Sequence, residues 1–270
     1  MSTARAGESR GRLGRALLQV GFFGGLVLLW HGLHAARIWD PVLFPSPLQV
    51  AQSFWTGFAN GSYPAAAAAS LQRLLLGYAL SVTGGVPLGL LLGRVRWADA
   101  TIGSLALGLQ AIPSICWLPL AILWFGLGEE GMLFVVVMGS LMALTLSVRD
   151  GVRAIPPLYL RAARMLGAGA RQAYLHVVLP ASLPAVVTGA KMGWSFAWRS
   201  LMAAELLYVD TGLGALLTTG RELHDMPQVV AVMGVIMLLG LLADRLVFGY
   251  LERKIQERWG HEPQGSGWGL

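Results

Sequence analysis

Long apolar stretches alternate with short polar segments along almost the whole chain. A helix that crosses a bilayer needs about 20 mostly apolar residues. The fifth stretch is the least apolar, because Lys191 and Arg199 interrupt it. The pattern predicts an all-α, polytopic membrane protein with about six transmembrane helices. The expected spans are about Ala16–Ala36, Ala65–Gly93, Thr101–Leu127, Met132–Val148, Leu179–Leu207 and Met226–Gly249.

The composition supports a membrane protein and argues against a soluble one. The 270 residues are 55% hydrophobic and only 13% charged, whereas a soluble domain carries about 25% charged residues. The mean hydropathy is +0.61. The net charge of +6 does not indicate a nucleic-acid partner, because the basic residues recur between apolar stretches and form no single patch.

The distribution of basic residues predicts the orientation of the spans. Cytoplasmic loops carry an excess of Lys and Arg, and fifteen of the 20 such residues fall into alternate polar segments. We therefore expect both termini in the cytoplasm of a bacterial cell, with a cytoplasmic segment 1–15, a transmembrane domain 16–250 and a cytoplasmic tail 251–270. The fifteen are Arg5, Arg10, Arg12, Arg15, Arg94, Arg96, Arg149, Arg153, Arg161, Arg164, Arg171, Arg245, Arg253, Lys254 and Arg258.

The first apolar stretch also fits a secretory signal peptide, since arginines precede it. The stretch is long, however, and no small-x-small cleavage site follows it. We therefore expect it to be retained as a span.

The longest basic loop, about 154–178, has a specific internal pattern. Pro156 and Pro157 suit the first turn of a helix, and Gly167 suits the left-handed residue that ends one. A second short helix is expected at about 170–178, before Pro180. On these features alone the loop consists of two surface helices.

The same loop resembles the signature of binding-protein-dependent ABC importer permeases. That signature reads Glu-Ala-Ala, three residues, Gly, nine residues and Ile-x-Leu-Pro. Arg161 stands where the family has an acidic residue, and Val177 replaces Ile. The residues at matching spacings are Ala162, Ala163, Gly167, Val177, Leu179 and Pro180.

The resemblance covers about residues 40–259, and shorter strings are similar to the nitrate, sulfonate, taurine and bicarbonate branch of these permeases. Each string is short, so the shared order along the chain carries more weight than any one of them. The same branch holds permeases for thiamine precursors and aromatic substrates. The strings are Phe44–Pro47, Leu123–Gly128, Ala203–Leu207, Gly212–Gly214 and Leu251–Lys254.

The resemblance implies a type I ABC importer fold and a set of partners. In the family the loop is a coupling helix that docks on an ATPase, which here involves Arg161 and the matching residues above. The implied partners are two ABC ATPase subunits, a second permease copy or paralogue, and a soluble substrate-binding protein. ATP and Mg belong to the ATPase subunits; this chain has no Gly-x-x-x-x-Gly-Lys-Ser/Thr loop, and we expect it to bind no cofactor and catalyse no reaction.

Polar residues within the apolar stretches are candidates for the substrate path, because charges in a membrane span usually face a cavity or a partner. Lys191, Ser195 and Trp198 share one helical face by spacings of four and three. A cationic, aromatic lining suits a small anion such as nitrate, a sulfonate or bicarbonate. The structural alternative pairs Arg199 with Glu205 or a carbonyl. The full candidate set is Lys191, Ser195, Trp198, Arg199, Glu205, Gln110 and Ser114.

Other function classes have less support. The five histidines are scattered without zinc-site spacing, and no nucleophile–base arrangement indicates an intramembrane enzyme. A stand-alone secondary transporter is the main alternative, although no internal repeat of the kind common in such proteins is visible. Half of an ABC exporter would normally carry a fused ATPase domain.

Overall fold

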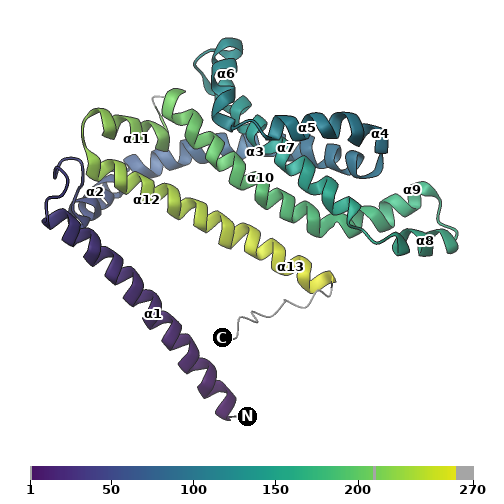
Figure 1. Ribbon diagram of the computed structural model, residues 1–270, viewed down its shortest axis with the longest axis horizontal. Coiled ribbons are helices and arrows are strands. Elements are labelled where there is room, and N and C mark those ends of the chain that lie inside the picture. Colours follow the sequence, from purple (N-terminus) through teal and green to yellow (C-terminus); the bar gives the residue numbers. More distant parts are fainter. Residues whose placement is uncertain (1, 209–210, 260–270) are drawn as a thin grey trace. The chain divides into compact units, whose positions relative to one another are not determined.

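The structure is built of helices. The computed structural model of the chain describes residues 2–208 and 211–259, and no strand occurs among them. Short π-helical turns join α4 to α5, α9 to α10 and α12 to α13, so each of these pairs forms one continuous run. The predicted all-α class is confirmed. In chain order the helices are α1 (Ser2–Ala35), α2 (Pro47–Ala59), α3 (Ser62–Arg94), α4 (Arg96–Ala98), α5 (Ser104–Gln110), α6 (Leu118–Phe125), α7 (Glu129–Arg153), α8 (Pro157–Met165), α9 (Ala170–Ala173), α10 (Leu179–Tyr208), α11 (Leu213–Glu222), α12 (Met226–Leu242) and α13 (Gly249–Trp259) (Figure 1).

Among the described residues, five helical runs are long and apolar enough to cross a membrane. A sixth candidate is a pair of helices, Arg96–Gln110 and Ser114–Phe125, bent by 99°. The prediction of about six spans is therefore confirmed: there are five among the described residues, or six if the bent pair is one span. The five runs are Leu17–Ala35, Ser62–Arg94, Glu129–Arg153, Ala170–Leu207 and Met226–Ile255.

The third apolar stretch, Thr101–Leu127, is broken at its prolines and is not one straight helix. Helix α5 ends shortly before Pro113, and the chain resumes as a 3-10 turn at Ser114–Trp117 followed by α6. Proline has no backbone N–H and its ring clashes with the preceding turn, so a helix ends there. Pro119 lies in the first turn of α6, where a missing donor is tolerated. Pro87 lies inside α3, which remains helical.

The chain forms two compact units, which are described separately. The first consists of Met1–Tyr63 and Leu216–Gly234. In it the indole N–H of Trp30 on α1 donates to the carbonyl of Pro45 at 3.0 Å. Ser46 and Gln49 form a capping box at the start of α2, which satisfies N–H groups that the first helical turn leaves unpaired.

The second unit consists of Pro64–Ala215 and Val235–Leu270, and a stripe of small residues joins its helices α3 and α7. A Cβ on Gly89 would lie 2.5 Å from the carbonyl oxygen of Thr145. The hydroxyl of Ser81 lies 2.7 Å from that of Ser140 on α7. Small residues at spacings of four let two membrane helices approach closely, because no side chain separates the backbones. The stripe on α3 is Gly77, Ser81, Gly85, Gly89 and Gly93.

Helix α7 is the central helix of the second unit. Over an 18-residue stretch of it, 56% of the residues are buried, the highest share among the candidate spans. Apolar clusters cover it on the sides of α3 and α10, and small residues again allow close approach to α10: Ser200 lies against Gly139. The buried cluster members are Leu74, Val136, Ala197 and Leu201 in one cluster, and Leu90, Leu144, Val148, Val152 and Val178 in another.

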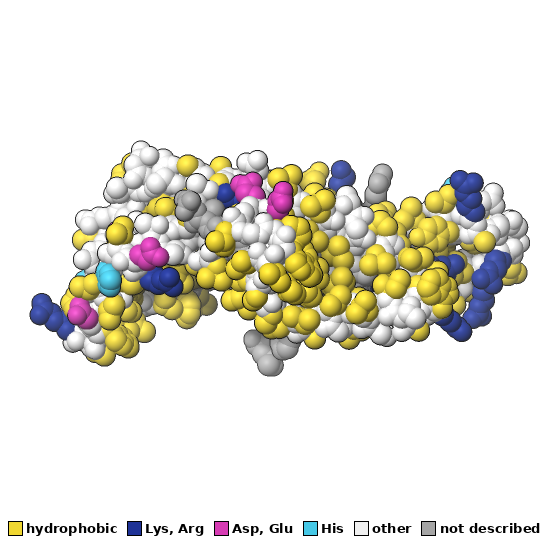
Figure 2. Space-filling model, turned by 90° about the horizontal axis from the view of Figure 1, so that it is seen from above, with side chains coloured by type: hydrophobic (Ala, Val, Ile, Leu, Met, Phe, Trp, Pro, Cys, Tyr) yellow, Lys and Arg dark blue, Asp and Glu magenta, His cyan; other side chains and the backbone are white. Residues whose placement is uncertain are grey.

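The surface carries many large apolar side chains, as expected for a protein whose solvent is lipid. Leu28, Leu75, Leu123 and Met237 are each more than half exposed. Figure 2 shows a face made mostly of hydrophobic side chains. Lys and Arg gather at its right-hand end, where Figure 1 places α8 and α9 of the second unit.

Candidate functional site: the loop before α10 and the bend between α5 and α6

The loop between α7 and α10 folds as the sequence predicts. Pro157 begins α8, and Gly167 follows its end with a φ of 82°. The N–H of Ala168 donates to the carbonyl of Ala163 at 3.0 Å, and the N–H of Gly167 donates to that of Arg164 at 3.0 Å. These two bonds make a Schellman cap. Its left-handed residue is unfavourable for any side chain with a Cβ, which accounts for the glycine.

Helix α8 exposes large apolar side chains beside its arginines. Leu158 is 67% exposed, and Met165 and Leu166 are each 89% exposed. Ala163, in contrast, is buried. A short helix outside the apolar spans with such exposed side chains is typical of a protein-contact surface.

A groove of about 770 Å³ runs beside α8, and several of the predicted coupling residues line it. Ala162, Ala163, Gly167 and Val177 are among its lining residues. Leu179 and Pro180 instead form the first turn of α10. Arg161 is exposed on α8 and does not line the groove.

The second half of the loop is continuous with a membrane span. Helix α9, the π-helical turn Tyr174–Val178 and α10 form the uninterrupted run Ala170–Leu207. The glycine cap at Gly167 separates this run from α8. The part of the loop beyond Gly167 and the polar residues of α10 therefore belong to one helical run.

Three of the predicted path residues meet at the bend between α5 and α6. Gln110, Ser114 and Arg199 line one cavity of about 260 Å³. The guanidinium carbon of Arg199 lies 4.8 Å from the ring centroid of Phe196, and its Nε donates to the carbonyl of Ser195 at 3.1 Å. Within the described part of the chain no carboxylate pairs with Arg199. A guanidinium with free N–H groups next to an amide and a hydroxyl is suited to binding an oxyanion.

Lys191 lies apart from this cavity and has acidic partners. Its Nζ lies 3.3 Å from a carboxylate oxygen of Asp244 and 3.4 Å from one of Glu252. The hydroxyl of Ser195 donates to the backbone carbonyl of Lys191 at 3.2 Å, and Trp198 packs against an apolar core cluster. The structure therefore does not bring Lys191, Ser195 and Trp198 to the cavity of Arg199.

Glu205 is also part of a separate arrangement. It is 1% exposed, and its carboxylate lies 3.3 Å from a guanidinium nitrogen of Arg73. Of the two structural alternatives for Arg199, the contact with a carbonyl occurs and the pair with Glu205 does not. The pair of Arg73 with Glu205 was not predicted from the sequence, because 132 positions separate the two residues. The only signal for it was that both are charged residues inside apolar stretches.

Comparison with known proteins settles the family. Residues 85–257 match the model of the binding-protein-dependent transport system inner membrane component. The chain belongs to this family of ABC transporter permeases. It is 34% identical over 224 residues to a chain of Methanocaldococcus jannaschii named as an ABC transporter permease, with 81% of this chain and 84% of the other covered.

Two further relatives fall in the branch that the sequence resembles. A taurine transport system permease of Escherichia coli is 28% identical over 232 residues, covering 84% of each chain. A nitrate import permease of Leptolyngbya laminosa is 27% identical over 218 residues, covering 77% of this chain and 78% of the other. The resemblance to the nitrate, sulfonate and taurine branch is thereby confirmed.

The fold is also that of a solved importer. The methionine ABC transporter MetNI in an inward-facing form matches with a TM-score of 0.60 and 20% identity, over 69% of this chain and 92% of the other. The chain is accordingly a multi-pass, inner-membrane permease subunit of an ABC importer, which works with ATPase and substrate-binding partners.

Proposed function

We propose that this permease carries a small oxyanion across the membrane, and that Arg199, Gln110 and Ser114 contact the anion on its path. The observation that carries the proposal is the guanidinium of Arg199, which faces a cavity and has no carboxylate partner in the described structure. Two other cations within the apolar runs, Arg73 and Lys191, are neutralised by acidic side chains. Two relatives are named for nitrate and for taurine, and nitrate and sulfonate groups both present oxygens that accept hydrogen bonds.

The proposed complex contains two permease chains, two ATPase subunits and one soluble binding protein. The exposed side chains of α8 and the groove lined by Ala162, Gly167 and Val177 support docking of an ATPase there. ATP and Mg are bound by the ATPase subunits, and this chain binds no cofactor and catalyses no reaction. Closure of the ATPase pair shifts the permease between inward-open and outward-open states, and the loaded binding protein biases the same equilibrium.

We further propose that both termini lie in the cytoplasm, with the transmembrane domain spanning 16–250 between a segment 1–15 and a tail 251–270. The basic residues near the ends of the runs support this orientation. Reporter fusions to either end test it: alkaline phosphatase activity at either terminus would contradict the proposal.

The test of the proposed substrate is ATP hydrolysis by the reconstituted complex. The permease is coexpressed with its ATPase and binding protein and placed in lipid nanodiscs. Hydrolysis is then measured with the binding protein loaded from a panel of nitrate, sulfonates, taurine, bicarbonate, aromatic carboxylates and thiamine precursors. Stimulation by an oxyanion supports the proposal, whereas stimulation only by an aromatic or thiamine-precursor substrate overturns it. Failure of any ATPase to copurify would favour a stand-alone transporter.

The role of Arg199 is tested by uptake into liposomes. Arg199→Gln is expected to lower uptake of the anion about 10- to 100-fold, since a hydrogen bond to a charged group contributes about 1.5–3 kcal/mol. Arg199→Lys retains the charge and should keep much of the uptake. Arg245→Gln, which removes an exposed charge from the run between α12 and α13, is the control and should leave uptake unchanged. Equal uptake by Arg199→Gln and wild type would exclude Arg199 from the path.

A further inference from the structure

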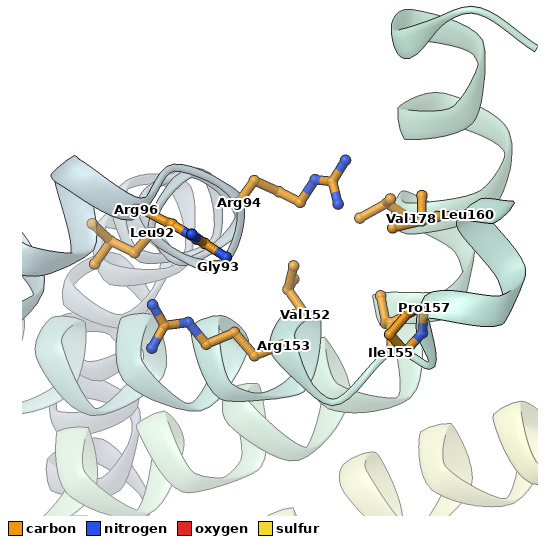
Figure 3. A pocket seen from close by; sticks show the side chains of 10 residues that line it. All are labelled: Leu92, Gly93, Arg94, Arg96, Val152, Arg153, Ile155, Pro157, Leu160 and Val178. Carbon is orange, nitrogen blue, oxygen red and sulfur yellow. The ribbon is translucent and has the colours of Figure 1, made fainter. Parts of the chain in front are cut away.

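Three arginines line a cavity of about 360 Å³ in the second unit, close to the start of α8. Arg94 ends α3, Arg96 begins α4 and Arg153 ends α7. Figure 3 shows Arg94 extending across the cavity toward Leu160 and Val178, while the guanidinium of Arg153 is directed toward the end of α3. The rest of the lining is apolar or backbone, and no acidic residue contributes to it.

The close packing of α3 on α7 brings together the helix ends that carry Arg94 and Arg153. A Cβ on Gly93 would lie 2.6 Å from Cβ of Val152, so the two helix ends nearly touch. The side chains of Arg94 and Arg153 leave the helices directly beside this contact. The small-residue stripe that holds the two helices thus places the arginines beside one cavity, although Arg94 and Arg153 extend in opposite directions (Figure 3).

The positive charge at this place exceeds the negative charge. Asp99 lies 2.5 Å from Arg153 and 3.4 Å from Arg149, and Arg149 also pairs with Asp150 at 2.8 Å. The carboxylates of Asp99 and Asp150 therefore pair with Arg149 and Arg153. The side chains of Arg94 and Arg96 form no hydrogen bond or ion pair with any described residue, and each residue is exposed. Like charges around one hollow repel one another, and a bound anion relieves that repulsion.

We propose that this cavity binds the phosphate of an anionic phospholipid headgroup. Guanidinium groups match phosphate oxygens in geometry and charge, and basic pockets between membrane helices bind anionic headgroups. Trp97, which directly follows Arg96, is 69% exposed. Leu91, near the end of α3, is 44% exposed. An exposed tryptophan between arginines and apolar residues is typical of the headgroup level of a bilayer.

The position of the cavity links such a lipid to the loop that precedes α10. Ile155, Pro157 and Leu160, which form the start of α8 and the residues before it, line the same cavity as the arginines. A headgroup bound there contacts both the C-terminal end of α3 and the N-terminal end of α8. ATP hydrolysis by the assembled complex is therefore expected to depend on the fraction of anionic lipid.

The test measures lipid binding to the delipidated permease–ATPase complex. Short-chain phosphatidylglycerol is titrated by calorimetry against wild type, the double variant Arg94→Gln/Arg96→Gln and the charge-matched control Arg245→Gln/Arg253→Gln, with phosphatidylcholine as the neutral lipid. Each arginine that contacts an anionic headgroup contributes about five-fold to its binding, so the double variant is expected to bind about 25-fold more weakly. The control pair and phosphatidylcholine binding should remain unchanged. If the double variant fails to fold, the single variant Arg96→Gln, with an expected loss of about five-fold, replaces it.

A second arm separates the two sources of phosphate. Millimolar sodium phosphate should not displace the lipid; displacement at that concentration would identify a soluble phosphate as the ligand and overturn the lipid assignment. Equal weakening in the control pair would mean that general surface charge, not this cavity, binds the lipid. Unchanged lipid binding together with loss of the ATPase during purification of the double variant would show that Arg94 and Arg96 contact the ATPase, and would overturn the proposal.

Discussion

The guanidinium of Arg73 on α3 and the carboxylate of Glu205 on α10 form an ion pair at 3.3 Å, and both side chains are almost fully buried. Arg73 also donates to the carbonyl and to the hydroxyl of Thr211, each at 2.8 Å. Glu205 accepts from the hydroxyl of Ser70 at 2.8 Å and from the N–H of Gly214 at 2.9 Å. The pair therefore joins α3, α10 and the segment that leads into α11.

Removal of one partner of this pair should be costly. Arg73→Gln leaves the Glu205 carboxylate buried without its counter-charge, and breaking such a pair costs about 3–5 kcal/mol. We expect a clear fall in the unfolding temperature of the purified protein in detergent, measured by intrinsic fluorescence. Glu129→Gln is the matched control, because Glu129 contacts the same arginine at 3.2 Å but is 71% exposed, and exposed pairs contribute about 1 kcal/mol or less. Equal shifts in the two variants would contradict the assignment of Glu205 as the main partner.

The sequence predicts the elements of this fold better than their contacts. Apolar length alone locates most of the spans, because a bilayer demands about 20 apolar residues wherever a helix crosses it. The same signal does not report direction: Pro113 indicates a kink in the third stretch, but its 99° angle does not follow from apolar length. The cap at Gly167 was predictable because its cause is local. The pair of Arg73 with Glu205 was not, because the packing of α3 against α10 is set by many residues that no local pattern connects.

The close contact of α3 with α7 predicts a strong effect of a single methyl group. Gly89→Ala places a Cβ 2.5 Å from the carbonyl oxygen of Thr145, so the helices must separate. Overpacking of this kind costs about 1–3 kcal/mol. Gly108→Ala on α5 is the control, since a Cβ there meets nothing within 4 Å. We expect a lower unfolding temperature for Gly89→Ala only; an unchanged value for it would show that α7 moves aside at little cost.

Because Lys191 pairs with two acidic residues, we expect it to stabilise the fold. Exchanging the charges of one pair tests this role. Lys191→Met leaves Asp244 and Glu252 facing each other without a cation, and we expect it to lower the unfolding temperature. The double variant Lys191→Glu/Glu252→Lys restores one opposite-charge pair and should recover part of the loss. Transport at the wild-type rate by this double variant would confirm that Lys191 is no part of the path. Loss of transport with full recovery of stability would instead place Lys191 on the path.

Replacing the left-handed glycine at the end of α8 should weaken the link between the loaded binding protein and ATP hydrolysis. Gly167→Ala forces a side chain into a φ of 82°, at a cost of about 1–2 kcal/mol, and this strain should shift the end of α8 relative to the run that continues into α10. We expect weaker stimulation of ATP hydrolysis by the loaded binding protein, while the spans, which lie outside this loop, stay folded. Gly169→Ala is the matched control: it lies two positions further along the same loop, its φ is −66°, and a Cβ there meets nothing within 4 Å. Because alanine fits that conformation, Gly169→Ala should keep full stimulation. If both variants lose stimulation to the same extent, side chains anywhere in the loop disturb the ATPase contact, and the geometry of the cap is not what transmits ATP-driven motion.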